Sequence, residues 1–430
     1  MSRQSPGATD SDPTAVRRLK WAAGMSVWLD GYNLTVVGAA LIWLTPGLHM
    51  AQGAATWLAA SALLGAMVGG LAAGWLTDRF GRRPIFTYDL IVFVVFALVS
   101  AAAPSVWVVM ASRLVMGLAI GADYAISPAY LSELADHRRR GYHLGFIWML
   151  WMVGAVGAFA LATLAAVALP PGAAWRFLFG VAAIPAVVTL FIRRDLPESP
   201  RWLRAQGLEK QGDEVTKNYG LERVADETLT LGRGEVVRRW ILVTVPWFLF
   251  DFATYGVGLL LPLVLTKAGV HGHVEVFLGS AVVMCGGIVG GVTSMRTVDR
   301  WGRKASQTWG LILAGLVLAT WLVLPRSAGA MEFFWLLAGA NMITQFGGLP
   351  TGMFPVEVFP TRSRATAAGV ATAVSRLGAV SGVVVLGIME ARFGLDGLVA
   401  GAALAAVLGG VVTGVFGFET KNRVLEEING

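Results

Sequence analysis

Twelve long apolar runs constrain this 430-residue chain more than any other feature of its sequence. A helix of about 20 apolar residues crosses the hydrocarbon core of a bilayer. These runs are too long and too uniformly apolar for strands, so we expect an all-α integral membrane protein with twelve transmembrane helices. The runs lie at residues 21–48, 54–76, 84–103, 106–131, 141–169, 173–192, 239–266, 273–297, 305–324, 331–358, 364–389 and 395–418.

The composition excludes most other classes of protein. Hydrophobic residues make up 56% of the chain and charged residues 14%, whereas soluble domains carry about 45–50% and about 25%. The five histidines form no cluster that would hold a metal, and the chain has no Gly-Lys-Ser/Thr loop for nucleotide phosphates. We therefore expect no enzyme and no cofactor. We expect the protein to be a monomer in the lipid bilayer.

The basic residues predict the orientation in the membrane. Loops on one side of the expected spans hold only four of the 34 Lys and Arg residues, while the tails and the long polar loop hold most of the others. Cytoplasmic loops carry the excess of positive charge, which also accounts for the net charge of +7 without a nucleic-acid partner. We expect a multi-pass protein of the inner or plasma membrane with both termini in the cytoplasm.

The two sides of the long polar loop repeat one another. Residues 78–83 read Asp-Arg-Phe-Gly-Arg-Arg, and residues 299–304 read Asp-Arg-Trp-Gly-Arg-Lys, 221 positions later; Asp30 and Asp251 have the same offset. This duplication predicts two pseudo-symmetric six-helix bundles with a substrate site between them, near the bilayer midplane. The expected units are a tail at 1–20, a bundle at 21–192, a linker at 193–238, a bundle at 239–418 and a tail at 419–430.

Three stretches resemble signatures of the major facilitator superfamily. Residues 74–84 are similar to its loop 2–3 motif, and residues 299–304 are a weaker copy. Residues 197–203 and 354–362 resemble the motifs that follow spans 6 and 10 in its sugar-porter group. The resemblance covers nearly the whole chain. It implies the fold of that superfamily and transport by alternating access, with the proton gradient as the energy source.

Residues 121–141 in span 4, 247–256 in span 7 and 361–379 at spans 10–11 are more specifically similar to phosphate:proton and metabolite:proton symporters. Residues 29–33 in span 1 resemble aromatic-acid:proton symporters. Trp151 and Arg376 stand where phosphate symporters are expected to carry Gln and Lys, which counts against inorganic phosphate and suits a larger, partly apolar solute. Asn33 stands where sugar:proton and aromatic-acid symporters carry a second Asp. Proton coupling would then depend on Asp30 or Asp251.

Ionisable residues inside the spans carry the functional hypothesis, because each costs about 2.5–3.5 kcal/mol at the bilayer centre. Asp30, Asp251 and Arg376 fall near the midplane at 1.5 Å of rise per residue. We expect Asp30, Asp251 and Asp123 to couple protons, the alternative being carboxylates satisfied by structural partners. We expect Arg376 to anchor an anion through its bidentate guanidinium. The alternative for Arg376 is a permanent pair with an Asp of the other half.

Other polar and aromatic residues are expected to line the site. Trp247 and Tyr255 lie four residues on either side of Asp251, so the three share one helix face. We expect Arg113, in span 4, to pair with Asp30. The expected substrate-binding residues, for which packing is the alternative, are Arg376, Trp247, Tyr255, Tyr124, Asn33, Trp151, Asn341 and Gln345.

Charged residues of the loop signatures form an expected cytoplasmic gate. Charge-assisted contacts between helix ends hold one conformation closed and break when the halves rock. These residues should therefore affect the transport rate rather than specificity. The gate residues we expect are Asp78, Arg79, Gly81, Arg82, Glu133, Arg140, Asp299, Arg300, Glu357 and Arg364.

The sequence favours proton symport of a small organic anion, a carboxylate or an aromatic acid. The first alternative is a sugar or polyol transporter, proton-coupled or facilitative, which the sugar-porter signatures favour. Further alternatives are efflux of drugs or metabolites, or a nutrient sensor that does not transport. The midplane charges favour the anion, since a neutral solute needs fewer of them.

Overall fold

The computed structural model describes residues 14–48, 50, 53–135, 138–218, 232–324 and 329–429. Most of the expected N-terminal tail and residues 219–231 of the expected linker lie outside the described residues. The first helix begins at Thr14, seven residues before the apolar run at 21. A helix continues past the hydrocarbon layer without cost where polar residues such as Arg17 and Arg18 face water.

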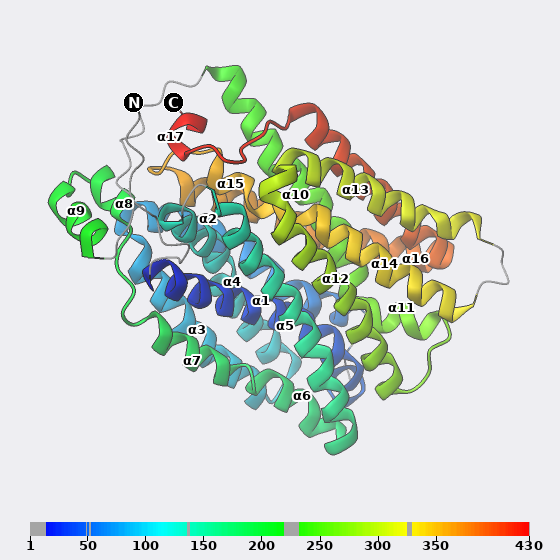
Figure 1. The fold of residues 1–430 in the computed structure, drawn as a ribbon. Helices are drawn as coiled ribbons and strands as arrows, with labels where there is room; N and C mark the ends of the chain where they lie inside the picture. Colours follow the sequence, from blue (N-terminus) through cyan, green and yellow to red (C-terminus); the bar gives the residue numbers. More distant parts are fainter. Residues whose placement is uncertain are drawn as a thin grey trace.

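The first half of the chain forms spans 1 to 6 (Figure 1). The sixth span consists of two short helices in tandem, which together run from Pro171 to Arg193. The helices are α1 (Thr14–Gly47), α2 (Ala54–Phe80), α3 (Arg82–Ala102), α4 (Val106–Leu134), α5 (Arg140–Ala168), α6 (Pro171–Gly180) and α7 (Ala183–Arg193).

Two short helices, α8 (Pro200–Ala205) and α9 (Glu209–Asn218), follow the sixth span, and the second half of the chain begins with α10. Pro200 opens α8 at a position where its missing N–H is not needed. The remaining elements are α10 (Arg233–Gly258), α11 (Leu261–Lys267), α12 (His273–Trp301), α13 (Arg303–Ala319), η1 (Thr320–Val323), α14 (Ala330–Gly348), η2 (Leu349–Gly352), α15 (Phe354–Glu357), α16 (Arg364–Phe416) and α17 (Leu425–Asn429).

The helices account for all twelve expected spans. Within the described residues, ten helical segments are long and apolar enough to cross a membrane. One of them, α16, has 53 residues and breaks at Gly394, whose φ of 65° is not helical, so its two arms are spans 11 and 12. The 19-residue helix α14 supplies span 10. The protein is thus an all-α membrane protein with the predicted twelve-helix architecture.

The two halves meet through matching helix pairs. Span 5 (α5) packs against span 8 (α12), and span 2 (α2) packs against span 11 in α16, as a two-fold relation between the halves requires. In Figure 1 the blue-to-green helices α1–α7 and the yellow-green-to-red helices α12–α16 form two neighbouring groups. We call the end of the molecule where α8, α9, α15 and α17 lie the linker end.

Candidate functional site

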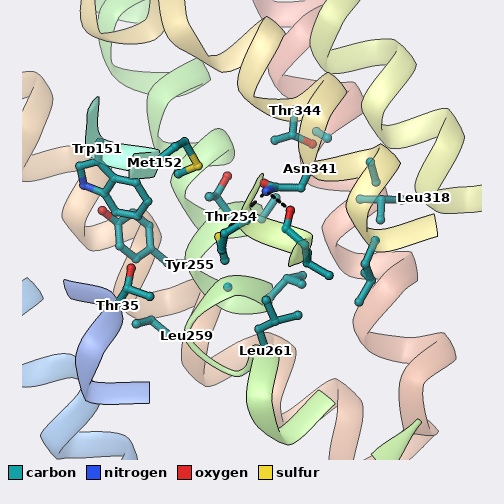
Figure 2. A pocket seen from close by; sticks show the side chains of 18 residues that line it. Thr35, Trp151, Met152, Thr254, Tyr255, Leu259, Leu261, Leu318, Asn341 and Thr344 are labelled. Carbon is teal, nitrogen blue, oxygen red and sulfur yellow. Dashed lines mark hydrogen bonds between the residues drawn. The ribbon is translucent and has the colours of Figure 1, made fainter. Parts of the chain in front are cut away.

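Two adjoining cavities lie between the halves, and together we call them the central cavity. They measure about 60 and about 50 Å³ and share Trp151, Met152, Thr254 and Tyr255 in their walls. Figure 2 shows the first, with Trp151 and Tyr255 side by side at one wall and Asn341 opposite. Since a water needs roughly 10–15 Å³ of such space, each cavity has room for a few waters. A larger solute therefore requires the halves to move apart.

An ion pair between Arg376 and Asp251 lies at the wall of the second cavity. Arg376 Nη2 is 2.9 Å from Asp251 Oδ2, and both side chains are buried. Arg376 Nη1 donates a 2.6 Å hydrogen bond to the Tyr255 hydroxyl. The guanidinium also lies 4.5 Å from the centroid of the Tyr124 ring, close enough for a cation–π contact. Both charges belong to the second half, so the partner of Arg376 is not an Asp of the other half.

Aromatic rings from both halves surround this ion pair. Trp148 and Trp151 come from α5, and Trp247 from α10. The Trp148 and Trp247 rings meet edge to face with centroids 5.8 Å apart, and the Trp151 and Tyr255 rings meet in the same way at 5.8 Å. As the helix spacing predicts, Trp247, Asp251 and Tyr255 all line the second cavity. The cavity therefore combines flat apolar walls with one cation.

Several donors in the central cavity have no partner. The indole N–H groups of Trp148 and Trp151 are buried without a hydrogen-bond acceptor, and so are Gln345 Nε2 and Arg376 Nε. An indole nitrogen can only donate. A buried donor without an acceptor costs about 1–3 kcal/mol. A ligand rich in acceptor oxygens would satisfy these groups.

Two predicted substrate-binding residues, Asn341 and Asn33, donate hydrogen bonds to backbone carbonyls. Asn341 Nδ2 donates to the carbonyl of Val283 at 3.0 Å and lines the first cavity. Asn33 is fully buried and lines neither part of the central cavity; its Nδ2 donates to the carbonyl of Leu29 at 3.0 Å. The side chain of Asn33 therefore satisfies its own helix rather than facing a solute in this conformation.

The expected pair between Asp30 and Arg113 is not formed. Arg113 Nη2 donates instead to the backbone carbonyl of Asn33 at 2.5 Å, and its guanidinium lies 5.3 Å from the centroid of the Phe179 ring. Asp30 Oδ2 is buried without a hydrogen-bond partner. Asp30 and Asn33 lie almost one helical turn apart on α1. Arg113 contacts the backbone of Asn33, whereas Asp30 lines a small cavity together with Asp89 and Asp123.

Asp123 has a partner that the sequence analysis missed. Arg193, the last residue of α7, bridges Asp123 Oδ1 at 2.7 Å and Asp89 Oδ1 at 2.9 Å. Sequence analysis counted Arg193 as the start of the linker. Asp89, in the middle of the third span, was an intramembrane charge and could have been recognised as one.

Two buried glutamates join the halves at the linker end. Glu133 binds Arg82 of its own half at 2.7 Å and Arg364 of the other half at 3.3 Å. Glu357 binds Arg303 of its own half at 3.0 Å and Arg140 of the other half at 3.0 Å. Each glutamate thus binds one arginine of its own half and one arginine of the other half. The structure thus brings together four of the predicted gate residues, Glu133, Arg140, Glu357 and Arg364.

Two aspartates cap helices of the opposite half. Asp78, at the end of α2, accepts from the backbone N–H of Thr366 at 2.7 Å, in the first turn of α16. Asp299, at the end of α12, accepts from the N–H groups of Gly141 at 3.1 Å and Tyr142 at 2.8 Å, in the first turn of α5. A carboxylate at a helix N-terminus satisfies free donors and complements the helix dipole.

Gly81 and Gly302 make room for a second pair of carboxylates. Their φ angles are 99° and 94°, a region open to glycine alone. A Cβ on Gly81 would lie 2.4 Å from Glu198 Oε2, which accepts from the backbone of Arg83. Glu419 takes the matching place beside Gly302. Burial raises the pKa of Glu198, although three backbone N–H groups oppose the rise. Glu198 and Glu419 were missed, yet they too are 221 positions apart.

Arg79 and Arg300 do not take part in this network. Both side chains are exposed at the linker end. The Arg79 guanidinium lies 5.3 Å from the centroid of the Trp75 ring on its own helix. In this conformation these two predicted gate residues face outward, because they lie one position beyond the aspartates that point into the interface.

Two pseudo-symmetric helical halves around a central cavity, joined at one end by exchanged ion pairs, define a secondary transporter of the membrane. A family model described as sugar (and other) transporter matches residues 21–430. The chain belongs to this family, and hence to a family of transporters rather than of enzymes.

Similar proteins carry related names. The inner membrane metabolite transport protein YgcS of Escherichia coli K12 is 29% identical over 91% of this chain and 89% of its own length. Plastidic glucose transporter 4 of Arabidopsis thaliana is 32% identical over 93% of this chain and 77% of its own length. The major facilitator superfamily proton:xylose symporter XylE has the same fold, with a TM-score of 0.80 at 21% identity, over 96% of this chain and 98% of its own.

Proposed function

We propose that this protein carries a small organic anion across the membrane together with a proton, by alternating access. The single observation that supports the anion is the central cavity itself. Arg376, the one cation among the described residues that line it, lies among buried N–H groups that lack acceptors, including the indoles of Trp148 and Trp151. A carboxylate supplies acceptor oxygens for these donors, and an apolar or aromatic part packs on the surrounding rings.

The Arg376–Asp251 pair supplies a coupling mechanism for this proposal. A solute carboxylate that takes the Arg376 guanidinium leaves Asp251 without its counter-charge. A buried carboxylate without a partner is strongly destabilised, so Asp251 takes up a proton when the anion binds. When the anion leaves, Arg376 attracts Asp251 again and the proton is released on that side of the membrane.

The linker-end contacts complete the cycle. The ion pairs exchanged between Glu133, Glu357 and their arginines hold that end closed in the present conformation. They have to break for the cavity to open there. Loading the cavity with an anion and a proton keeps its net charge constant. The loaded and the empty protein therefore both change conformation without moving net charge across the membrane.

A sugar or polyol is the second candidate, and the name of the family and the glucose transporter among the relatives favour it. Sugar hydroxyls also accept hydrogen bonds from indole and amide N–H groups. They do not, however, compete with Asp251 for a guanidinium, so sugar binding leaves the ion pair intact.

Ligand-induced thermal stabilisation of the purified full chain tests the proposal. The ligands are a set of aliphatic and aromatic carboxylates, inorganic phosphate, glucose and xylose. We expect stabilisation by at least one carboxylate in the wild type and its loss in Arg376→Gln, with Arg300→Gln at the exposed surface as the matched control. Stabilisation by sugars alone, unchanged in Arg376→Gln, would overturn the proposal that the solute is an anion. It would favour a sugar or polyol as the solute.

A further inference from the structure

A second group of buried charges lies within the first half, apart from the Arg376–Asp251 pair. Asp30, Asp89, Asp123 and Arg193 come from α1, α3, α4 and α7, and none is more than 7% exposed. Asp30, Asp89 and Asp123 line a common cavity of about 10 Å³, which is room for one water. We call these four residues the carboxylate cluster.

The cluster has more negative charge than its surroundings can balance. Arg193 contacts one oxygen of Asp89 and one of Asp123 and also donates to the hydroxyl of Ser26. It offers one positive charge for three carboxylates. Arg376, on the facing half, also attracts Asp30 electrostatically, but it is already paired with Asp251. With all three carboxylates ionised, the buried cluster would hold two uncompensated negative charges. Buried groups avoid this by taking up protons.

Contacts within the cluster show where protons are needed. Asp89 Oδ1 and Asp123 Oδ1 both contact the guanidinium of Arg193, at 2.9 Å and 2.7 Å. One guanidinium balances one buried negative charge, so one of the two carboxyl groups has to carry a proton. Asp30 is 2% exposed, lines the small cavity, and has an oxygen, Oδ2, with no hydrogen-bond partner. An unpartnered buried oxygen is tolerated far better on a neutral carboxyl than on a carboxylate.

We propose that the carboxylate cluster is a proton-storing site that holds two exchangeable protons, with Arg193 balancing the third carboxylate. One proton is shared between Asp89 and Asp123, and the other resides on Asp30. The cavity between the three aspartates has room for one water, which would pass protons among them. This inference goes beyond the proposed function, since it requires no particular solute. It assigns roles to Asp89 and Arg193.

Infrared spectroscopy of the full chain in lipid vesicles at neutral pH tests the proposal. The carbonyl stretch of a protonated carboxyl group is separate from that of a carboxylate, so its intensity counts protonated side chains. We expect Asp89→Asn to lower the count by one, because the two remaining aspartates then share one arginine. We expect Arg193→Gln to raise it by one, because the carboxylate that Arg193 balanced then takes up a proton.

Two controls separate charge balance from structural damage. Arg193→Lys keeps the positive charge and should leave the count unchanged. Asp195→Asn removes an exposed carboxylate two residues further on and should also leave it unchanged. An unaltered count in both Asp89→Asn and Arg193→Gln would overturn the proposal. The measurement needs no solute, so it stands or fails independently of anion transport.

Discussion

Arg376 is the side chain on which the proposed anion site depends. It is buried, ion-paired with Asp251 and hydrogen-bonded to Tyr255, and its guanidinium faces the Tyr124 ring. Arginine keeps its charge at any physiological pH, so the site always offers a cation to the solute. The carboxylate of Asp251 is the partner that can be exchanged.

Arg376→Lys should retain transport with weaker binding, whereas Arg376→Gln should abolish it. Lysine keeps the charge but loses the second N–H of the fork. One charge-assisted hydrogen bond contributes about 1.5–3 kcal/mol, so we expect the Kd of the anion to rise about 10- to 150-fold in Arg376→Lys. Isothermal titration with the best carboxylate measures it. An unchanged Kd in both variants would mean that Arg376 does not contact the solute.

The two indole donors give a second test at the residue scale. Phenylalanine at position 148 or 151 keeps a ring in the wall but removes the N–H. A neutral hydrogen bond contributes about 0.5–1.5 kcal/mol, so each variant should raise the KM for uptake about 2- to 10-fold. Trp309→Phe is the matched control, because that ring is 70% exposed on the outer face of α13. KM values in Trp148→Phe and Trp151→Phe that equal the value in Trp309→Phe would show that the two indole donors do not bind the solute.

Helix ends, rather than single residues, set the conformation at the linker end. The end of α2 caps α16, and the end of α12 caps α5, so each half terminates a helix of the other. The exchanged ion pairs of Glu133 and Glu357 lie beside these caps. This doubled arrangement follows from the duplicated sequence and makes closure of the linker end a property of four helices at once.

Asp78→Ala should shift the conformational equilibrium toward opening at the linker end. Loss of a helix cap costs about 0.5–2 kcal/mol, which corresponds to a change of about 2- to 30-fold in the ratio of open to closed molecules. Spin labels at residues 80 and 362, in a Cys285→Ser background, measure the distance across this end. Arg79→Gln is the control, because Arg79 lies exposed beside the cap. A distance distribution that is the same in both variants would contradict the role of the cap.

On the scale of the whole molecule, the architecture could be predicted because apolar run length and internal repetition are both local in sequence. The runs predicted the spans, and the offset of 221 residues predicted matching gate residues in the two halves. The shared face of Trp247, Asp251 and Tyr255 followed from helix periodicity, which is also local. Trp148 could have been found in the same way, since it lies three residues before Trp151.

Contacts between distant spans could not be predicted in this way. The position of Arg193 between Asp89 and Asp123 depends on how α3, α4 and α7 pack, and no residue spacing reports that. The Asp30–Arg113 pair was expected from a resemblance, but Arg113 donates to the backbone of Asn33 and Asp30 lines a cavity with Asp89 and Asp123. The alternative that sequence analysis gave for Arg376 was a partner of the other half, whereas its partner Asp251 in α10 belongs to the same half as α16.

Proton movement that is triggered by solute tests the central claim most directly. Full-length protein in liposomes with a pH dye inside would receive carboxylates, phosphate or sugars from outside, in the wild type and in Asp251→Asn. The account predicts that at least one carboxylate acidifies the interior and that Asp251→Asn abolishes this proton flux. Acidification by sugars only, or carboxylate uptake without proton movement, would contradict anion:proton symport.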